Sequence, residues 1–208
     1  MKTRIIYFIY NFFYEPIFNF IYLIKWKIYG KKLFKKDGKN HQIMYVSLIH
    51  GGGLARHVSD LTEGLKTNYA IWIIRKNRWI YHINGSNRSI FRYPETMTLS
   101  EVISEINPSV IHIHQLSETL WEIPHIPLDK CVITLHDVYY VCPHYFMTEC
   151  LGTRFCHPSL CSKEWREQMH SILQQCKCII APSTAIKEII LFYYPDIEEK
   201  IIIIEHGI

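Results

Sequence analysis

Histidines and other polar residues follow several apolar runs of this sequence, where they could bind a phosphate or a sugar. The groups are His50 with Gly51, Gly52 and Gly53; His114 with Gln115; His136 with Asp137; Pro182 with Ser183; and His206 with Gly207. Consecutive glycines allow positive φ and close approach of a ligand, and the first amides of a following helix favour an anion. The glycine run is therefore a candidate binding site.

Among the histidines, His136 is the one that we expect to contact a ligand. Asp137, Tyr139 and Tyr140 follow it at the end of an apolar run, which is where ligands gather in parallel sheets. His112 lies inside an apolar run, and we interpret it as a buried structural residue. Ser183 precedes a helical pattern, so helix capping and ligand contact both stay open.

A cysteine-rich segment offers a second kind of candidate site. Cys142, Cys150, Cys156 and Cys161 are separated by seven, five and four residues, which matches no compact zinc motif. We therefore expect no bound metal, with this cysteine group as the alternative. The odd total of 7 cysteines and the lack of a cleavable signal sequence favour a reducing, cytoplasmic location.

Apolar runs that alternate with helical patterns predict the elements that position these residues. The expected strands are 43–49, 69–74, 110–114, 131–135, 178–181 and 201–204; the expected helices are 54–66, 99–106, 163–176 and 184–193; and an inserted hairpin is expected from 79–83 and 89–93. The predicted fold class is α/β, a doubly wound parallel sheet whose carboxyl strand ends hold the ligand.

Two familiar uses of a glycine loop are disfavoured. A dinucleotide site needs G-x-G-x-x-G and an acidic residue after the second strand, whereas Arg75 and Lys76 close that strand here. The letters HGGG of a hydrolase oxyanion hole are present, but the G-x-S-x-G elbow is absent, so an α/β hydrolase is only a remote alternative. A nucleotide-sugar or sugar-phosphate site remains.

The amino-terminal residues 1–38 differ in kind from residues 39–208. Residues 5–24 are apolar and aromatic but contain Glu15 and Pro16, and a lysine cluster follows (Lys25, Lys27, Lys31, Lys32, Lys35 and Lys36). We expect an apolar helix that attaches peripherally to the membrane surface; a single span and a helix docked on the domain stay open. The whole chain has 23 basic and 19 acidic residues, and without the six clustered lysines the remainder is near neutral, so we expect no nucleic-acid partner.

Across residues 42–208, the motifs GGGLARHVSDLTEGL, PSVIHIHQ, VITLHDVYYVCPHY, CIIAPS and KIIIIEHGI resemble, in this order, the amino-terminal domain of family 4 glycosyltransferases. The resemblance implies a Rossmann-like, acceptor-side domain of the GT-B fold. It implies retaining transfer from a nucleotide-diphosphate sugar to a glycan or lipid-linked acceptor in envelope polysaccharide or glycolipid synthesis. No cofactor beyond this co-substrate is expected.

The resemblance also assigns roles to residues. It implies His136 and Asp137 as catalytic residues, with His136 against the transferred sugar and Asp137 supporting its loop. Donor or acceptor binding is expected of Gly51, Gly52, Gly53, Arg56, His57, His114 and Ser183. No two glutamates have seven residues between them, the pair that a donor domain carries. We therefore expect the donor domain on a second chain or lost by truncation, with a non-catalytic sugar- or partner-binding module as the alternative.

Overall fold

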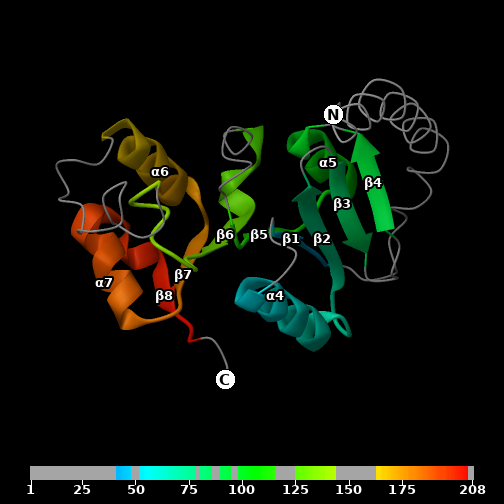
Figure 1. Cartoon of the computed structure of the whole chain (residues 1–208), viewed down its shortest axis with the longest axis horizontal. Helices are drawn as coiled ribbons and strands as arrows, with labels where there is room; N and C mark the ends of the chain where they lie inside the picture. Colours follow the sequence, from blue (N-terminus) through cyan, green and yellow to red (C-terminus); the bar gives the residue numbers. More distant parts are fainter. Residues whose placement is uncertain are drawn as a thin grey trace, which may run out of the picture.

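An eight-stranded sheet with the order β4-β3-β2-β1-β5-β6-β7-β8 forms the centre of the computed structural model (Figure 1). The structure describes residues 41–47, 52–77, 80–85, 90–94, 98–115, 125–143 and 163–205. The strands are β1 (Gln42–Val46), β2 (Ala70–Asn77), β3 (Ile80–Gly85), β4 (Ile90–Pro94), β5 (Val110–Ile113), β6 (Cys131–Thr134), β7 (Cys178–Ala181) and β8 (Ile201–Ile203). The helices are α4 (Gly52–Leu65), α5 (Leu99–Ile106), α6 (Lys163–Gln175) and α7 (Thr184–Tyr193), with 3-10 turns η4 (Leu128–Lys130) and η6 (Pro195–Lys200).

Strand pairing makes most of this sheet parallel. β1 pairs in parallel with β2 and with β5, and β5 to β8 continue in parallel. β3 and β4 pair antiparallel at the β2 edge. This arrangement confirms the predicted α/β fold with a Rossmann-like parallel sheet, and it confirms the hairpin inserted after the second strand.

The strand order changes direction at β1. From β1 the chain first adds β2 on one side and later returns to add β5 on the other side. At such a switch point the connections leave in opposite directions, and a crevice opens at the carboxyl ends of the two central strands. The topology therefore locates a binding site beyond the ends of β1 and β5.

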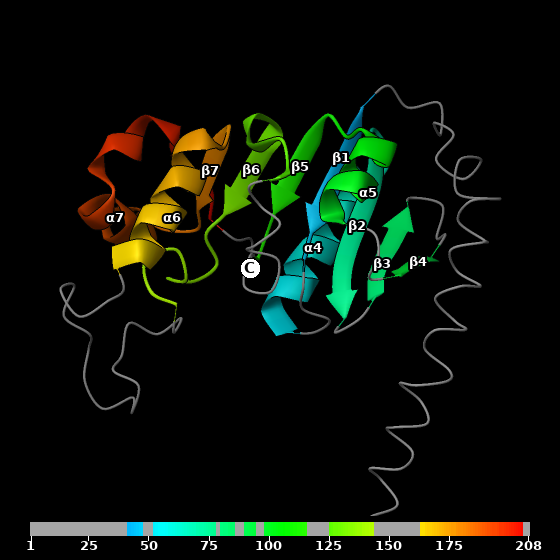
Figure 2. The same cartoon turned by 90° about the horizontal axis from the view of Figure 1, so that it is seen from above.

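Side chains alternate between the two faces of the sheet, and each face has its own core. Tyr45, Ile71 and Ile73 point toward α4, where they pack with Val58. The opposite face carries a much larger cluster, which includes Met44, Val46, Ile111 and Ile133 and side chains of α5 and α6. Figure 2 shows α5 and α6 in front of the strands and α4 behind them. Helices on both faces bury the apolar runs of the central strands.

Capping residues explain why α5 has the bounds expected from the sequence. Thr98 accepts a hydrogen bond from the Glu101 amide, and the Glu101 carboxylate accepts one from the Thr98 amide. Asn107 ends the helix with a left-handed φ of 48°. These are the reciprocal capping box and the left-handed carboxyl cap that stabilise short helices.

Several predicted boundaries were wrong by one to three residues. Helix α4 begins at Gly52 rather than at Leu54, so Gly52 and Gly53 belong to its first turn. Strand β1 ends at Val46, and β2 extends to Asn77 instead of ending at Ile74.

The predicted amino-terminal helix and the domain boundary at residue 38 lie outside the described residues. Within the described ranges, the structure contains no helix with the length and apolar character needed to cross a membrane.

Candidate functional site

Three histidines meet at the carboxyl edge of the sheet. His114 directly follows β5, His136 follows β6 by two residues, and His57 lies on α4. One ring nitrogen from each histidine lies within 4.8 Å of the others. The His114 Nδ1 and His136 Nε2 atoms form a hydrogen bond of 3.0 Å. Three separate elements thus bring imidazoles together at the switch point.

The pleat of the strands explains why these histidines share one face. Ile111, Ile113 and Ile133 belong to the larger core, so the residues between and directly after them face α4. The Tyr45 ring, which also faces α4, lies 5.6 Å from the His112 ring and 5.5 Å from the His114 ring. The histidine cluster is therefore the polar end of the smaller core.

The helix α4 brings its own imidazole to the same place. The His57 ring lies 5.5 Å from the His114 ring and 5.3 Å from the His136 ring. His114 is buried at 2% exposure, whereas His57 and His136 are half-buried. The rings of His57 and His136 are therefore accessible to a ligand, and the buried His114 ring packs beneath them.

His112 lies two residues before His114, on the same face of β5 and farther from the carboxyl edge of the sheet. Its Nε2 atom is 2.7 Å from the Thr134 hydroxyl, and its ring is 4.0 Å from the His114 ring. Burial, with a smaller repulsion from His57, lowers the pKa of His112 to about 4. The ring is consequently neutral at physiological pH, which agrees with its interpretation as a structural residue.

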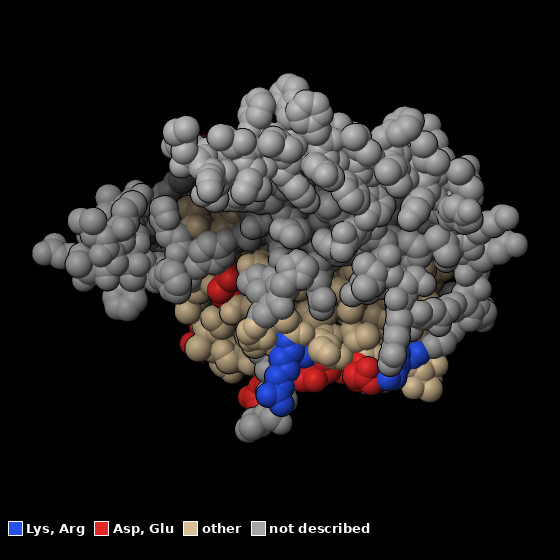
Figure 3. Space-filling model, turned by 45° about the vertical axis from the view of Figure 1, so that its right-hand side comes forward, with Lys and Arg blue, Asp and Glu red and all other residues tan. Residues whose placement is uncertain are grey.

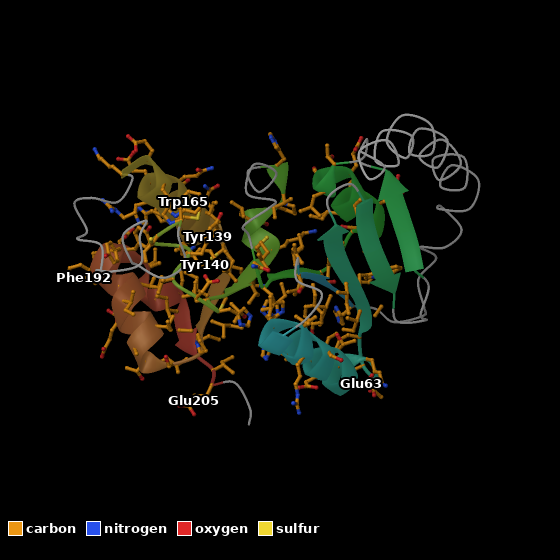
Figure 4. The ribbon with its side chains drawn as sticks, in the orientation of Figure 1. Glu63, Tyr139, Tyr140, Trp165, Phe192 and Glu205 are labelled. Carbon is orange, nitrogen blue, oxygen red and sulfur yellow. The ribbon has the colours of Figure 1, made fainter. Side chains whose placement is uncertain are left out.

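A network of hydrogen bonds fixes the loop that carries His136. The Tyr139 amide donates to the Asp137 carboxylate at 2.9 Å, and the Trp165 indole of α6 donates to the Tyr139 carbonyl at 2.9 Å. The Tyr194 hydroxyl donates to the Tyr140 carbonyl at 2.7 Å. Figure 4 shows Tyr139, Tyr140 and Trp165 close together beside α6.

Asp137 is therefore a residue that shapes the loop. Its carboxylate accepts the amide two residues ahead, which is the pattern of an Asx turn. Burial raises the pKa of Asp137, and the hydrogen bond from Tyr139 opposes that rise. This geometry fits the expected supporting role.

The other predicted binding residues lie on helix termini or on the outer side of α4. Gly52 has a φ of 76°, a conformation that strains any residue with a side chain. Gly51 lies outside the described residues. The Arg56 side chain is 86% exposed and lies 3.9 Å from Asp60. Ligand contact by these residues stays a prediction.

The structure describes Ser183 and one of the four cysteines named above. Ser183 caps α7, because its hydroxyl accepts the Ile186 amide at 3.3 Å. Its contact with a ligand stays a prediction. Cys142 is a buried free thiol, while Cys150, Cys156 and Cys161 lie outside the described residues.

The described charged side chains on the face seen in Figure 3 do not form a patch of one sign. On the face seen in Figure 3, the described acidic and basic side chains lie next to one another near one edge. Neighbours in sequence account for ion pairs such as Arg56 with Asp60 and Lys163 with Glu167. Exposed pairs of this kind contribute between about 0 and 1 kcal/mol each, so the histidine cluster is the more specific feature.

The family model described as Glycosyltransferase Family 4 matches residues 51–208. The matched segment contains all three histidines of the cluster. No curated protein shows significant similarity to the chain.

Proposed function

Because the chain belongs to Glycosyltransferase Family 4, we propose that it forms the acceptor-side half of a retaining glycosyltransferase. The proposed reaction transfers a sugar from a nucleotide-diphosphate sugar to a glycan or lipid-linked acceptor in envelope polysaccharide or glycolipid synthesis. The observation that supports this proposal most is the meeting of His57, His114 and His136 at the switch point of the sheet.

The imidazole pair suits recognition of sugar hydroxyls. A neutral imidazole donates through one nitrogen and accepts through the other, so it can bind a hydroxyl in either role. The hydrogen bond between His114 and His136 fixes the orientation of the half-buried His136 ring. We assign the sugar contact to His136, with His114 as the residue that positions it.

Asp137 acts on the reaction through the loop in this proposal. Its carboxylate is engaged by the Tyr139 amide, and it directly follows His136 in the chain. Replacement of Asp137 would shift the His136 ring without removing any substrate contact. Asp137 is thus a positioning residue rather than a catalytic one.

The beginning of α4 is the proposed phosphate side of the same site. Gly52 adopts positive φ, and an added Cβ at Gly52 or Gly53 would meet no atom within 4 Å among the described residues. Open space beside the first amides of a 14-residue helix suits an anion. We therefore propose that the diphosphate lies between the first turn of α4 and the histidine cluster.

Peripheral attachment to the cytoplasmic face of the membrane belongs to the same proposal. The apolar residues 5–24 and the following lysine cluster lie outside the described residues, so this part rests on the sequence. A lipid-linked acceptor would then be held in the plane of the membrane beside the site.

Saturation-transfer difference NMR of the full chain tests the proposed function. The probes are UDP-glucose, UDP-N-acetylglucosamine and GDP-mannose, each with the wild type, His136→Ala and His41→Ala. We expect the sugar protons of at least one probe to be saturated, with a dissociation constant of about 1 mM, roughly −4 kcal/mol. His136→Ala should reduce this saturation, whereas His41→Ala should not, because His41 is exposed and directly precedes β1, at the opposite end of the strand from the cluster.

Two results would contradict the proposal. One is the absence of saturation for every nucleotide sugar. The other is saturation of free glycans that is equally strong without a nucleotide, which would favour a non-catalytic sugar-binding module.

A further inference from the structure

We propose that His57, His114 and His136 form a zinc site. The sequence led us to expect no metal and to name the cysteine segment as the alternative. The structure instead groups three imidazoles, each from a different element, with one ring nitrogen of each within 4.8 Å of the others. The proposal goes beyond the sugar contact assigned to His136, with which it shares His114 and His136, and its test measures metal binding alone.

The distances suit a tetrahedral ion. Zinc bonds to histidine nitrogen at about 2.0–2.1 Å, which places two tetrahedral ligand nitrogens roughly 3.3–3.4 Å apart. The His114 Nδ1 and His136 Nε2 atoms are already 3.0 Å apart. The third nitrogen lies within 4.8 Å of these two, so it must approach by at most about 1.4 Å. The half-buried His57 ring would have to rotate to bring its nitrogen to the ion.

The imidazole chemistry is compatible with this change. One of the two hydrogen-bonded nitrogens now carries a proton that the other accepts. Zinc would take the place of that proton between the rings, and the proton would move to the other nitrogen of the donating ring. Both rings stay neutral, so no charge is buried besides that of the ion.

The surroundings of His114 hold its ring in place. His114 is 2% exposed, and the rings of Tyr45 and His112 lie against it at 5.5 Å and 4.0 Å. Ligands carried by packed strands and helices keep their geometry better than ligands on loops. The site is thus largely formed before the ion arrives.

Three protein ligands leave a coordination position open. Among the described residues, the cluster has no fourth histidine, cysteine, aspartate or glutamate. Zinc sites that bind three histidines and one water or substrate oxygen are open, whereas structural sites have four protein ligands. We therefore infer an exchangeable oxygen ligand on this ion.

The test is metal binding by the full chain after removal of bound metal with a chelator. We expect one equivalent of Zn²⁺ by equilibrium dialysis, and visible ligand-field bands when Co²⁺ replaces it. His57→Ala, His114→Ala and His136→Ala should each weaken zinc binding by more than about a hundredfold, because losing a ligand costs more than the 10–100-fold loss from an outer partner. The variant His41→Ala, checked for equal folding by circular dichroism, should bind as the wild type does, because His41 is exposed and directly precedes β1.

The cobalt spectrum separates this site from the cysteine segment and does not depend on the variants folding. Histidine ligation gives no thiolate-to-cobalt charge-transfer band in the near ultraviolet. Such a band, a substoichiometric metal content, or zinc binding that the three variants retain would each overturn the proposal. Failure of zinc binding leaves the nucleotide-sugar saturation experiment unaffected, so the two proposals fail separately.

Discussion

Tyr194→Phe should destabilise the loop that carries His136 and Asp137. Tyr194 is 3% exposed, and its hydroxyl donates to the Tyr140 carbonyl at 2.7 Å. Burial raises the pKa of Tyr194, so the hydroxyl stays protonated and remains a donor. The variant keeps the ring, so it creates no large cavity and removes this hydrogen bond from a buried carbonyl. That change costs about 1–3 kcal/mol of unfolding free energy.

The effect should be measurable at individual amides of the loop. The Val141 and Cys142 amides both donate to the Val138 carbonyl, at 3.0 Å and 2.9 Å. If opening of this turn becomes about 2 kcal/mol easier, its amides exchange roughly 30-fold faster, because 1.36 kcal/mol corresponds to a factor of ten. Hydrogen exchange followed by NMR gives the local change, and urea unfolding gives the global change.

Tyr140→Phe is the matched control, since it removes a hydroxyl from the same loop. Tyr140 is 3% exposed, and its hydroxyl is buried with no hydrogen-bond partner within the described ranges. Its removal should change the unfolding free energy by no more than about 0.5 kcal/mol, or should stabilise the protein. Equal destabilisation by the two variants would refute the reasoning.

Two further predictions concern the cysteines and the membrane. Cys131 is fully buried, and burial, followed by repulsion from Cys176 and Asp129, raises its pKa to about 12. About one Cys131 thiol in ten thousand is therefore ionised at pH 8. Iodoacetamide should label the partly exposed Cys178 before Cys131. Mass spectrometry measures both sites, and equal labelling without denaturant would contradict the assignment. The full chain should pellet with anionic vesicles and be partly released by high salt, whereas a variant with glutamine at the six clustered lysines should lose about 1 kcal/mol per lysine. If neither high salt nor these substitutions reduce pelleting, a spanning helix would be favoured.

The sequence predicted strands best where burial on both faces leaves a continuous apolar run. β7 has the bounds Cys178–Ala181 that its sequence suggested. The end of β1 could not be predicted, because Leu48 and Ile49 continue the apolar run of the strand. In the structure, the residues that pair with β2 and β5 end at Val46. The extent of this pairing depends on the neighbouring strands, so it cannot be predicted from the sequence of β1 alone.

The predicted start of α4 was wrong for a different reason. Glycine is a poor helix former, so the sequence predicts a loop at Gly52 and Gly53 before the helix. The structure includes both in the first turn, where the positive φ of Gly52 lets the chain enter the helix.

The candidate site could be predicted residue by residue but not as a cluster. His114 and His136 were named from their positions after strands, and the face they share follows from the pleat. Their 3.0 Å separation also depends on the register of β5 against β6, in which Ile113 lies opposite Ile133. The resemblance implied a binding role for His57, but its position beside the other two rings depends on where α4 packs on the sheet, which neighbouring elements decide.

The unequal cores on the two faces of the sheet affect how the site moves. Helix α4 has one fully buried side chain, Val58, and it packs on a small cluster around Tyr45 and Ile71. The strands that carry His114 and His136 are held by the far larger core on the other face. Local opening begins where few apolar contacts must be broken, so α4 separates from the sheet more readily than the strands separate from each other. A ligand that joins His57 to the other two histidines would therefore stabilise a helix that otherwise opens often, and its affinity would include the free energy needed to keep α4 closed.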